Sequence, residues 1–582
     1  MASGLSAYRP QIMGVTHMVS AGHYLATGAG YRILEQGGNA VDAGVATGIA
    51  LNVILPWACG FGGVAPIVIY DAGKDEVITI SGLGRWPKAA SIDYFMEQAG
   101  GEIPSGILRC VTPAAADAWM TALETYGTMT FEEVVGPALE LAAEGFPVPE
   151  FDRTFLDLPA ETEGGEWVNW PSTAEIFMPD GRPLREGEPL VQADLATTFR
   201  RLIEVEKANA LKGRAGAVRA ARDFFYKGDI AEEMVRFAQQ QRGLLTMEDM
   251  GEFAVKLEKP VKGTYRDYQV YTCGPWCQGP VVAQTLQMLS DDDLISLGHN
   301  SADYIHLLVE SLKLAFADRH HYYGDPDLVD VPIDGLLSPG YTAERRGLVD
   351  MGRAHPEMPH PGDPWPYQRE PGDRGAVSVP EATGGRTEQD TTYVCVVDRW
   401  GNAFSATPSD PFYDSPVVPG LGFAISSRGS QTWLEPGHPS GLQPWKRPRL
   451  TPNPAMAFKD GKLFMPFGTP GGDSQCQSMV QAFLNATQFG MDPQRAIEEP
   501  RFVSWSFPNS FWPHAYQPGR LVLEGRIPAD VAQELSKRGH RIELEADWTP
   551  RTGAVCMILV DQGSGVLKGG ADPRRSAYAM GR

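Results

Sequence analysis

Two adjacent threonines, Thr391 and Thr392, open an apolar run directly after the segment 351–390, which is rich in proline, glycine and charge. A threonine hydroxyl is a weak nucleophile and needs a base. If the chain were cut before Thr391, the new α-amine, with a pKa of about 7.7 in model compounds, could serve as that base. The order of linker, threonine and strand fits this chemistry. On these residues alone, the simpler interpretation is favoured: an ordinary strand that begins with threonine, a residue common in strands.

Two glycines, Gly471 and Gly472, follow the apolar run LFMPFGTP. A glycine turn between a strand and a helix leaves backbone N–H groups accessible, and such donors can stabilise an oxyanion. The helix that follows adds a dipole favourable to negative charge. Taken alone, a tight turn that requires positive φ explains the pair better. The GxxxxGK[ST] pattern of a phosphate-binding loop is missing here.

Neither a metal nor a cofactor is expected. The seven cysteines are odd in number and scattered along the chain, which favours free thiols in a reducing compartment over a disulfide framework. The adjacent His320 and His321 would point in different directions on any regular element, and no cysteine or histidine clusters have the spacing of a zinc site.

Composition and charge indicate a soluble protein with a small-molecule or peptide substrate. Hydrophobic residues make up 43% of the chain and charged residues 21%, and the net charge is −22 without a basic cluster. Such an acidic surface disfavours binding to nucleic acid or to an anionic membrane. The longest apolar stretch, 45–58, is too short to span a bilayer, and the N-terminus lacks a secretory signal. A cytoplasmic location is therefore expected.

The elements that must position these residues are of mixed type. Asn39 is a good helix N-cap, and small and apolar residues follow it up to Pro56, which predicts a buried helix. Strands are expected at 66–70, 76–80, 269–272, 463–468 and 553–561, with two more around a turn at 398–402. Helices are expected over most of 113–241, at 302–317 and from about residue 474. Because strands and helices alternate in both halves, the predicted class is α+β.

Several longer motifs occur in a fixed order along the chain. They are ILEQGGNAVDAGVA, GTYRDYQVYT, KLAFADRHHYYGDPD, TTYVCVVDRWGNAFSAT, KRPRLTPNPAM, PGGDSQ and ADPRR. With these motifs, from about His17 to Arg575, the sequence resembles the γ-glutamyltranspeptidase family of N-terminal-nucleophile hydrolases. The combination is far more specific than any one motif.

The resemblance implies a four-layer αββα sandwich and cleavage of the precursor before Thr391. The segments 1–390, ending in the linker at 351–390, and 391–582 would remain one intertwined catalytic domain. This is a self-generated two-chain heterodimer, with further dimerisation left open. Thr391 would form an acyl-enzyme that water or an amine then resolves. Gly471 and Gly472 match the family's oxyanion glycines. By position, Ser409 would lie near the nucleophile's amine, with Thr407 as the alternative.

The same comparison shows departures in the residues that hold glutamate. Ile92 stands where the family has an arginine for the substrate carboxylate, and Pro411 where it has an asparagine. An aliphatic side chain cannot replace a bidentate guanidinium. The aspartate that would hold the substrate ammonium is missing from SSRGS at 426–430, and the family's serine pair becomes Leu450 and Thr451.

Three residues are left as candidates for substrate binding. Thr451 stands in the place of the second serine. Arg428 either binds a substrate carboxylate from another direction or forms a structural salt bridge, because a buried arginine finds a carboxylate partner either way. Arg85 is a weaker candidate for the same task.

The favoured function is a self-processing threonine amidohydrolase for a small acyl amide other than a γ-glutamyl one. The first alternative is a γ-glutamyl hydrolase or transpeptidase with a rebuilt glutamate pocket. The second alternative belongs to another class: an unprocessed, non-catalytic binding protein. Against this last interpretation, Thr391, Thr392, Gly471 and Gly472 are all present.

Overall fold

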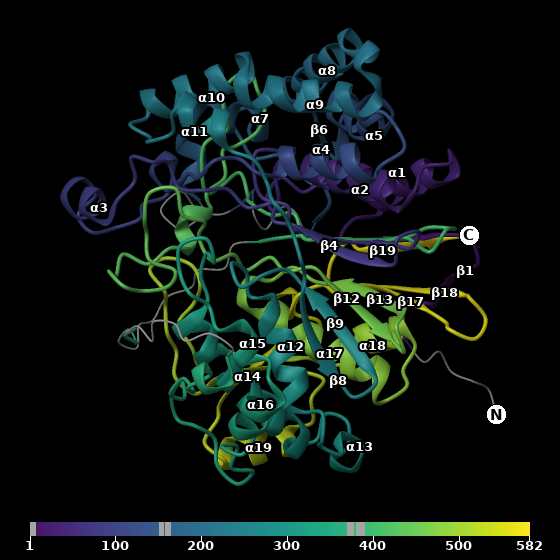
Figure 1. The fold of residues 1–582 in the computed structure, drawn as a ribbon, viewed down its shortest axis with the longest axis vertical. Coiled ribbons are helices and arrows are strands. Elements are labelled where there is room, and N and C mark those ends of the chain that lie inside the picture. The colour runs from purple at the N-terminus through teal and green to yellow at the C-terminus, as the bar shows by residue number, and fades with distance from the viewer. Residues whose placement is uncertain (1–6, 151–155, 158–164, 369–376, 380–389) are drawn as a thin grey trace.

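The computed structural model describes residues 7–150, 156–157, 165–368, 377–379 and 390–582. Two seven-stranded sheets lie face to face in the middle of the molecule, and a layer of helices covers the outer face of each (Figure 1). This is the predicted four-layer αββα sandwich.

One sheet has the strand order β19-β2-β10-β11-β3-β4-β7. Its strands are β2 (Met18–Ala21), β3 (Ile67–Asp71), β4 (Glu76–Ile80), β7 (Leu257–Glu258), β10 (Val394–Val397), β11 (Ala403–Ala406) and β19 (Tyr578–Gly581). All neighbouring pairs are antiparallel. The predicted hairpins β3–β4 and β10–β11 are both present, and β10 pairs in register with β2 on its other side.

The second sheet has the order β1-β18-β17-β13-β12-β9-β8. Its strands are β1 (Ile12–Gly14), β8 (Val261–Tyr265), β9 (Tyr268–Thr272), β12 (Ala455–Lys459), β13 (Lys462–Gly468), β17 (Cys556–Val560) and β18 (Leu567–Ala571). Both sheets therefore contain strands from before and after Thr391, and in the second sheet four strands from after it lie between strands from before it, so the two predicted segments are interleaved.

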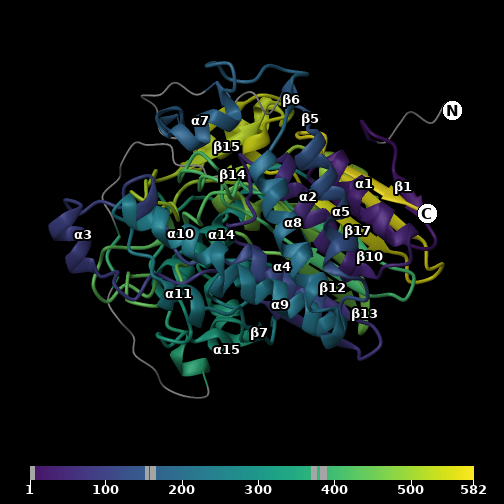
Figure 2. The same cartoon turned by 90° about the horizontal axis from the view of Figure 1, so that it is seen from above.

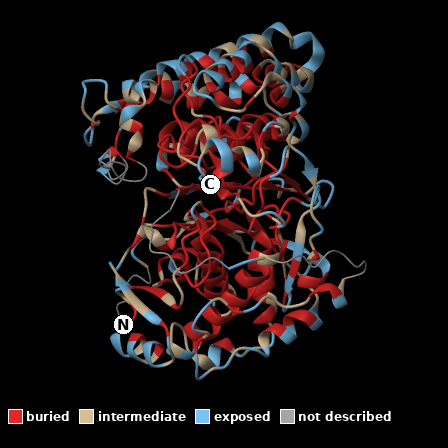
Figure 3. Cartoon of the chain, turned by 90° about the vertical axis from the view of Figure 1, so that its left-hand side faces the viewer, coloured by how far each residue is buried: buried red, intermediate tan, exposed pale blue. Residues whose placement is uncertain are grey.

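Three apolar clusters separate the four layers. One fills the space between the first sheet and the helices α1 (Tyr24–Glu35), α2 (Ala40–Ile54), α4 (Ala115–Tyr126) and α5 (Phe131–Glu144). A second lies between the two sheets. The third joins the second sheet to α12 (Gly279–Met288), α14 (Ala302–Tyr322) and α17 (Gln475–Thr487). Figure 3 shows the buried residues in the middle of the molecule and the exposed ones along the outer helices.

Helix α2 forms for the reasons expected from its sequence. Asn39 accepts hydrogen bonds from the first turn, and Asp42 reaches back to the backbone of Asn39, which makes a full capping box. Every residue of α2 is buried, because it packs on β10 and β11 below and lies between α1 and α5 (Figure 2). Gly44 permits this close approach: a Cβ there would lie 2.2 Å from the ring of Phe404.

Two parts of the fold differ from the sequence expectation. Helix α14 continues five residues beyond the predicted end at Ala317 and ends at Tyr322. The glycine-containing C-terminus forms the strands β18 and β19, neither of which was expected. No helix among the described residues has the length and apolar character needed to cross a bilayer.

The remaining elements surround this frame. The helices are α3 (Ile92–Gln98), α7 (Pro171–Phe177), α8 (Ala193–Ala208), α9 (Gly213–Lys227), α10 (Asp229–Gln240), α11 (Met247–Glu252), α13 (Leu294–Leu297), α15 (Ile333–Leu336), α16 (Pro339–Arg346), α18 (Pro493–Glu498) and α19 (Ala529–Lys537). The 3-10 helices are η1 (Ile107–Arg109), η2 (Glu166–Asn169), η3 (Ala210–Lys212), η4 (Trp365–Tyr367), η5 (Arg428–Gln431), η6 (Gly472–Ser474) and η7 (Pro550–Thr552). The small strands are β5 (Phe146–Pro147), β6 (Pro189–Leu190), β14 (Phe502–Ser504), β15 (Arg520–Glu524) and β16 (Arg541–Glu545). Residues 369–376 and 380–389 of the predicted linker lie outside the described residues.

Candidate active site

The candidate nucleophile lies just before β10, the third strand of the first sheet. Thr391 precedes β10 and forms an antiparallel bridge with Ser409, which follows β11. Ser409 forms a second bridge with Val64. Thr391 and Ser409 are both buried, so their relative position is fixed by backbone pairing on each side.

A chain of hydrogen bonds connects Thr391 to the peptide carbonyl before it. Thr391 Oγ1 and Ser409 Oγ are 2.9 Å apart, and Ser409 Oγ donates to the carbonyl oxygen of Asp390 at 3.0 Å. Arg428 also donates to Ser409 Oγ through Nη2. A serine hydroxyl has one hydrogen and two lone pairs. Since a guanidinium only donates and a carbonyl only accepts, Ser409 gives its hydrogen to Asp390 and accepts that of Thr391.

Arg428 is held on its other side by a buried aspartate. Its Nε lies 2.7 Å from Asp410 Oδ1, and Ser426 and Ser427 donate to the same carboxylate at 2.5 and 3.2 Å. Burial raises the pKa of Asp410, while the charge of Arg428 and the two serine hydroxyls act in the opposite direction. Of the two predicted roles of Arg428, this geometry favours the salt bridge. Nη2 donates to Ser409, whereas Nη1 and Nε have no hydrogen-bond partner among the described residues and Nε is held by its ion-pair contact with Asp410.

The residue before Thr391 is held at several points. Asp390 Oδ1 accepts from the N–H of Thr391 at 2.8 Å and from Arg575 Nη1 at 2.6 Å. The N–H of Asp390 donates to the hydroxyl of Tyr413 at 3.3 Å. The peptide bond between Asp390 and Thr391 is therefore immobilised from both ends, next to the nucleophile.

Of the two candidates for the hydroxyl beside the nucleophile, the geometry favours Ser409. Thr407 Oγ1 is buried and has no hydrogen-bond partner in the part of the chain that the structure describes. The backbone N–H of Thr407 bonds to Pro66, which places Thr407 in line with β11. Its role in catalysis remains a prediction.

The glycine pair forms the expected turn. Gly471 has φ +119° and Gly472 has φ +54°, and they lead from β13 through η6 into α17. The carbonyl of Gly471 accepts from the backbone and hydroxyl of Ser474. Neither glycine N–H donates a hydrogen bond to any described residue. Two N–H groups are thus available at the head of a helix, as an oxyanion hole requires.

A glutamine links this turn to Thr451. Gln278 Nε2 donates to the carbonyls of Thr451 and Gly472 at 2.9 and 2.8 Å, and Arg319 donates to its Oε1 at 2.9 Å. The Thr451 hydroxyl accepts from Gln431, which lies in η5 beside Arg428. Sequence reasoning missed Gln278. Arg319 stood within one of the family motifs, but nothing in the motif indicated this contact.

Arg85 lies in a different set of contacts. Its guanidinium bonds to the carboxylates of Asp325 and Asp327 and to the carbonyl of Trp445. Arg447 shares both carboxylates with it. This ion-pair cluster favours a structural role for Arg85 over the predicted role in substrate binding.

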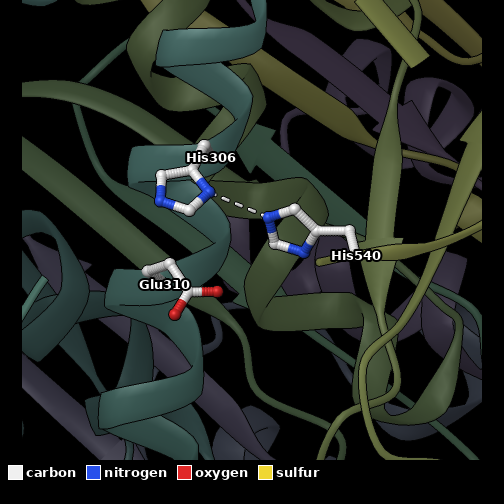
Figure 4. A group of neighbouring side chains, drawn as sticks. All are labelled: His306, Glu310 and His540. Carbon is white, nitrogen blue, oxygen red and sulfur yellow. Dashed lines mark hydrogen bonds between the residues drawn. The ribbon is translucent and has the colours of Figure 1, made fainter. Parts of the chain in front are cut away.

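A possible metal-ligand group was not evident from the sequence. His306, Glu310 and His540 offer ligand atoms within 4.8 Å of one another, and Figure 4 shows their side chains converging between α14 and the residues after α19. Two of them lie one helical turn apart, but His540 is distant in the sequence, so spacing gave no signal.

The contacts within this group favour a hydrogen-bond network. His306 Nδ1 and His540 Nε2 are 2.9 Å apart, and His306 Nε2 lies 2.9 Å from the carbonyl of Asp350. Glu310 accepts from Lys313 and from the ring of His355, both at 2.7 Å. Burial raises the pKa of Glu310, but these partners outweigh it and take the pKa to about 2. A divalent ion would have to displace the histidine pair beside a buried ammonium, which is electrostatically unfavourable.

Comparisons with known proteins identify the family. The sequence profile described as gamma-glutamyltranspeptidase matches residues 26–582. The glutathione hydrolase proenzyme of Bacillus subtilis (strain 168) is 32% identical over 583 residues, covering 99% of this chain and 93% of that protein. The solved structure of LmbA2991HD is 36% identical with a TM-score of 0.90, and covers 99% of this chain and 100% of that one. Cephalosporin acylase from Bacillus halodurans is 27% identical with a TM-score of 0.84, and covers 100% and 99%. The chain therefore belongs to the γ-glutamyltranspeptidase family, whose members are hydrolases and transferases that act on amide bonds.

Proposed function

We propose that this protein is a self-processing threonine amidohydrolase, which cleaves its own chain before Thr391 and then hydrolyses a small acyl amide through an acyl-enzyme on Thr391. The observation that carries the proposal is the hydrogen-bonded row of Thr391, Ser409 and the Asp390 carbonyl. The Thr391 hydroxyl, the Ser409 hydroxyl that can relay its proton, and the peptide bond after Asp390 are adjacent and buried.

Maturation follows from this row. Thr391 Oγ1 attacks the carbonyl carbon of Asp390 and passes its proton to Ser409 Oγ, while Ser409 passes its own hydrogen to the oxyanion that develops on Asp390. The C–N bond then breaks and the nitrogen of Thr391 takes up the proton, which leaves Asp390 as an ester on Thr391. Water hydrolyses the ester, giving a carboxylate on Asp390 and a free amine and hydroxyl on Thr391.

Turnover uses the same hydroxyl with a new base. The unprotonated α-amine of Thr391 accepts the hydroxyl proton as the oxygen attacks the substrate carbonyl. The N–H groups of Gly471 and Gly472 stabilise the oxyanion. The amine of the substrate leaves with a proton, and water then releases the acyl group as a carboxylic acid.

The substrate proposal rests on the residues beside the nucleophile. The guanidinium of Arg428 is already paired with Asp410, and Ile92 offers no charge to a glutamate carboxylate. We therefore propose an acyl group other than γ-glutamyl, in line with the cephalosporin acylase relative. A γ-glutamyl hydrolase or transpeptidase is the second candidate, because the glutathione hydrolase proenzyme of Bacillus subtilis matches nearly the whole chain. Parallel assays with glutathione, a γ-glutamyl anilide and neutral acyl anilides separate the two.

The first experiment is the intact mass of the purified protein with N-terminal sequencing of any smaller fragment. A fragment that starts Thr-Thr-Tyr-Val is the expected result. A chain that remains uncut after long incubation would contradict the proposal and favour an unprocessed, non-catalytic binding protein.

Two further predictions concern the surroundings of the protein. We propose that the two segments remain associated as a heterodimer without nucleic acid or membrane partners. We also propose a cytoplasmic location, with which seven unpaired, buried cysteines are compatible because a reducing compartment keeps thiols free.

Replacing the second hydroxyl tests its role. Ser409→Ala is expected to slow maturation about 10- to 100-fold, because the donor to Asp390 and the acceptor for Thr391 are lost together, and to slow turnover because the Thr391 hydroxyl loses the contact that orients it. The time course of cleavage on a denaturing gel measures the first, and steady-state kinetics the second. Ser409→Thr keeps the hydroxyl and is the matched control. If Thr407→Val slowed cleavage and Ser409→Ala did not, the two assignments would be reversed.

A further inference from the structure

Arg428 contacts the nucleophile through another residue and has no part in the steps above. We propose, on the basis of the proposed function, that Arg428 is a positioning residue: its ion pair with Asp410 fixes Ser409 and directs a buried positive charge toward Thr391. Neither Arg428 nor Asp410 would touch the substrate. This assigns to the pair a role in both maturation and turnover.

The pair is built to hold one orientation. Arg428 is fully buried, and its planar guanidinium engages Asp410 through Nε and Ser409 through Nη2. Asp410 has φ +93°, an unfavourable value for a residue with a side chain. Ser426 and Ser427 each donate a hydrogen bond to the carboxylate of Asp410. A backbone held in such a conformation indicates that the surrounding contacts specify the position of this carboxylate.

The direction of the charge follows from this order. Asp410 lies on the Nε side of the guanidinium, while Nη2 faces Ser409 and, beyond it, Thr391. The positive end of the pair therefore donates to the hydroxyl that bonds Thr391, whereas the carboxylate of Asp410 is not bonded to that hydroxyl. A nearby positive charge disfavours protonation of an amine. After cleavage, the pair would thus keep the α-amine of Thr391 in the unprotonated form, in which it can act as a base.

The other charged and titratable groups around Thr391 are largely paired or neutral. Asp390 and Arg575 form an ion pair that itself contacts Thr391, through the N–H of Thr391 at 2.8 Å and its carbonyl at 3.4 Å, so their charges offset each other there. Arg109 is bonded to Asp414 at 2.5 Å. Burial raises the pKa of Cys59 and of Tyr413, so both are neutral at the pH of an assay. Among the described groups, the Arg428–Asp410 pair is the one with a direct contact to the hydroxyl that bonds Thr391.

The test is the pH dependence of kcat/KM in the mature enzyme, because its acid limb reports the pKa of the base in the free enzyme. Arg428→Gln removes the positive end and is expected to move the acid limb up by about 0.5–1 pH unit. Asp410→Asn leaves the positive end without its counter-charge and is expected to move the limb down by a similar amount. A purely structural salt bridge predicts no such opposite shifts.

Separate measurement of kcat and KM for Arg428→Gln distinguishes a positioning role from a role in substrate binding. Positioning predicts that Arg428→Gln lowers kcat about 10-fold and leaves KM within about twofold. If Arg428 instead held a substrate carboxylate, KM would rise and the acid limb would stay in place. Arg428→Lys keeps the charge without the planar fork, so it should retain the wild-type acid limb while cleaving its own chain more slowly.

The double variant Arg428→Gln/Asp410→Asn is the control for effects of misfolding. It removes both charges and should return the acid limb to near its wild-type position. Circular dichroism and thermal melting report the fold of each variant. If Arg428→Gln does not fold, Asp410→Asn and Arg428→Lys still test the proposal. Equal shifts in one direction, or no shift, in variants that fold and cleave would overturn it. A wild-type chain that never cleaves would instead remove the proposed function, so the two failures are distinguishable.

Discussion

Thr391→Ala is expected to give a single uncut chain without amidase activity. The variant lacks the oxygen that attacks Asp390 and, later, the substrate, so both reactions lose their nucleophile. Loss of a nucleophile typically lowers the rate by about 10⁴-fold or more, which is beyond detection in an ordinary assay. Intact mass and hydrolysis of a panel of acyl anilides measure the two losses.

The neighbouring threonine provides a matched control. Thr392 is buried like Thr391, but its N–H bonds to Pro408 and its hydroxyl packs close to Gly22 rather than to Asp390. Thr392→Ala should therefore cleave and turn over at close to the wild-type rate. Thr391→Ser keeps a hydroxyl and should cleave more slowly yet completely. Cleavage of Thr391→Ala at the same position would show that another group attacks this bond.

Gly471→Ala is expected to lower kcat by about 10²- to 10³-fold, equivalent to ~2.7–4 kcal/mol, while the protein still cleaves itself. At φ +119° a side chain is strained, and the new Cβ would lie 2.3 Å from Ser474 Oγ. Relief of this clash must move the turn and with it the N–H groups proposed to bind the oxyanion. Self-cleavage is spared because Ser409, and not the glycine turn, contacts the carbonyl of Asp390.

Gly461 offers the control for strain alone. It lies between β12 and β13, at the far end of the strand that leads to Gly471, and has φ +75° with open space around its Cβ position. Gly461→Ala should cost about 1–2 kcal/mol of stability without changing kcat. Thermal melting and steady-state kinetics of the two variants separate strain from catalysis. Equal kcat values for Gly471→Ala and the wild type would argue against this oxyanion hole.

The helix α2 and the central hairpins were predictable because their signals are local. Asn39 and Asp42 cap one end of α2 within four residues, and the turn at 398–402 separates two short apolar strands. The end of α14 was not predictable. Asp318 and Arg319 look like a polar helix end in sequence, yet they are fully buried and paired with Arg345 and Asp473, which come from other elements.

The C-terminal strands were missed because their composition reflects packing and not strand propensity. In β18, a Cβ on Gly570 would lie 2.8 Å from the backbone of Pro493, and one on Gly569 would lie 2.6 Å from the sulfur of Met18 and 3.1 Å from the Cβ of Ala579. Glycine is needed because the neighbouring elements approach so closely. Read along the chain, the same glycines indicate a loop.

The candidate site was predictable only as far as the family motifs extend. Thr391, Gly471 and Gly472 follow from motif position, and the structure places Ser409 against Thr391 as that position implied. The role of Arg428 stayed open between two interpretations, because its partner Asp410 lies in another loop. The hydrogen bond between Gln278 and the glycine turn could not be predicted, because a glutamine that donates to two carbonyls distant in the chain leaves no pattern in the sequence.

The interleaving of strands from the two segments affects whether the cut protein can refold after it unfolds. While the chain is continuous, β10 finds its place between β2 and β11 in an intramolecular search. Once the chain is cut, the pairing of β10 with β11 stays within one segment, but its pairing with β2 becomes a bimolecular association of two segments, neither of which holds a complete sheet. After thermal unfolding, the fraction of the cut form that refolds should therefore be low and should fall on dilution. The fraction of the uncut Thr391→Ala chain that refolds should not depend on dilution. Under the proposed function, the cleavage that frees the α-amine of Thr391 also removes the covalent connection that makes refolding intramolecular.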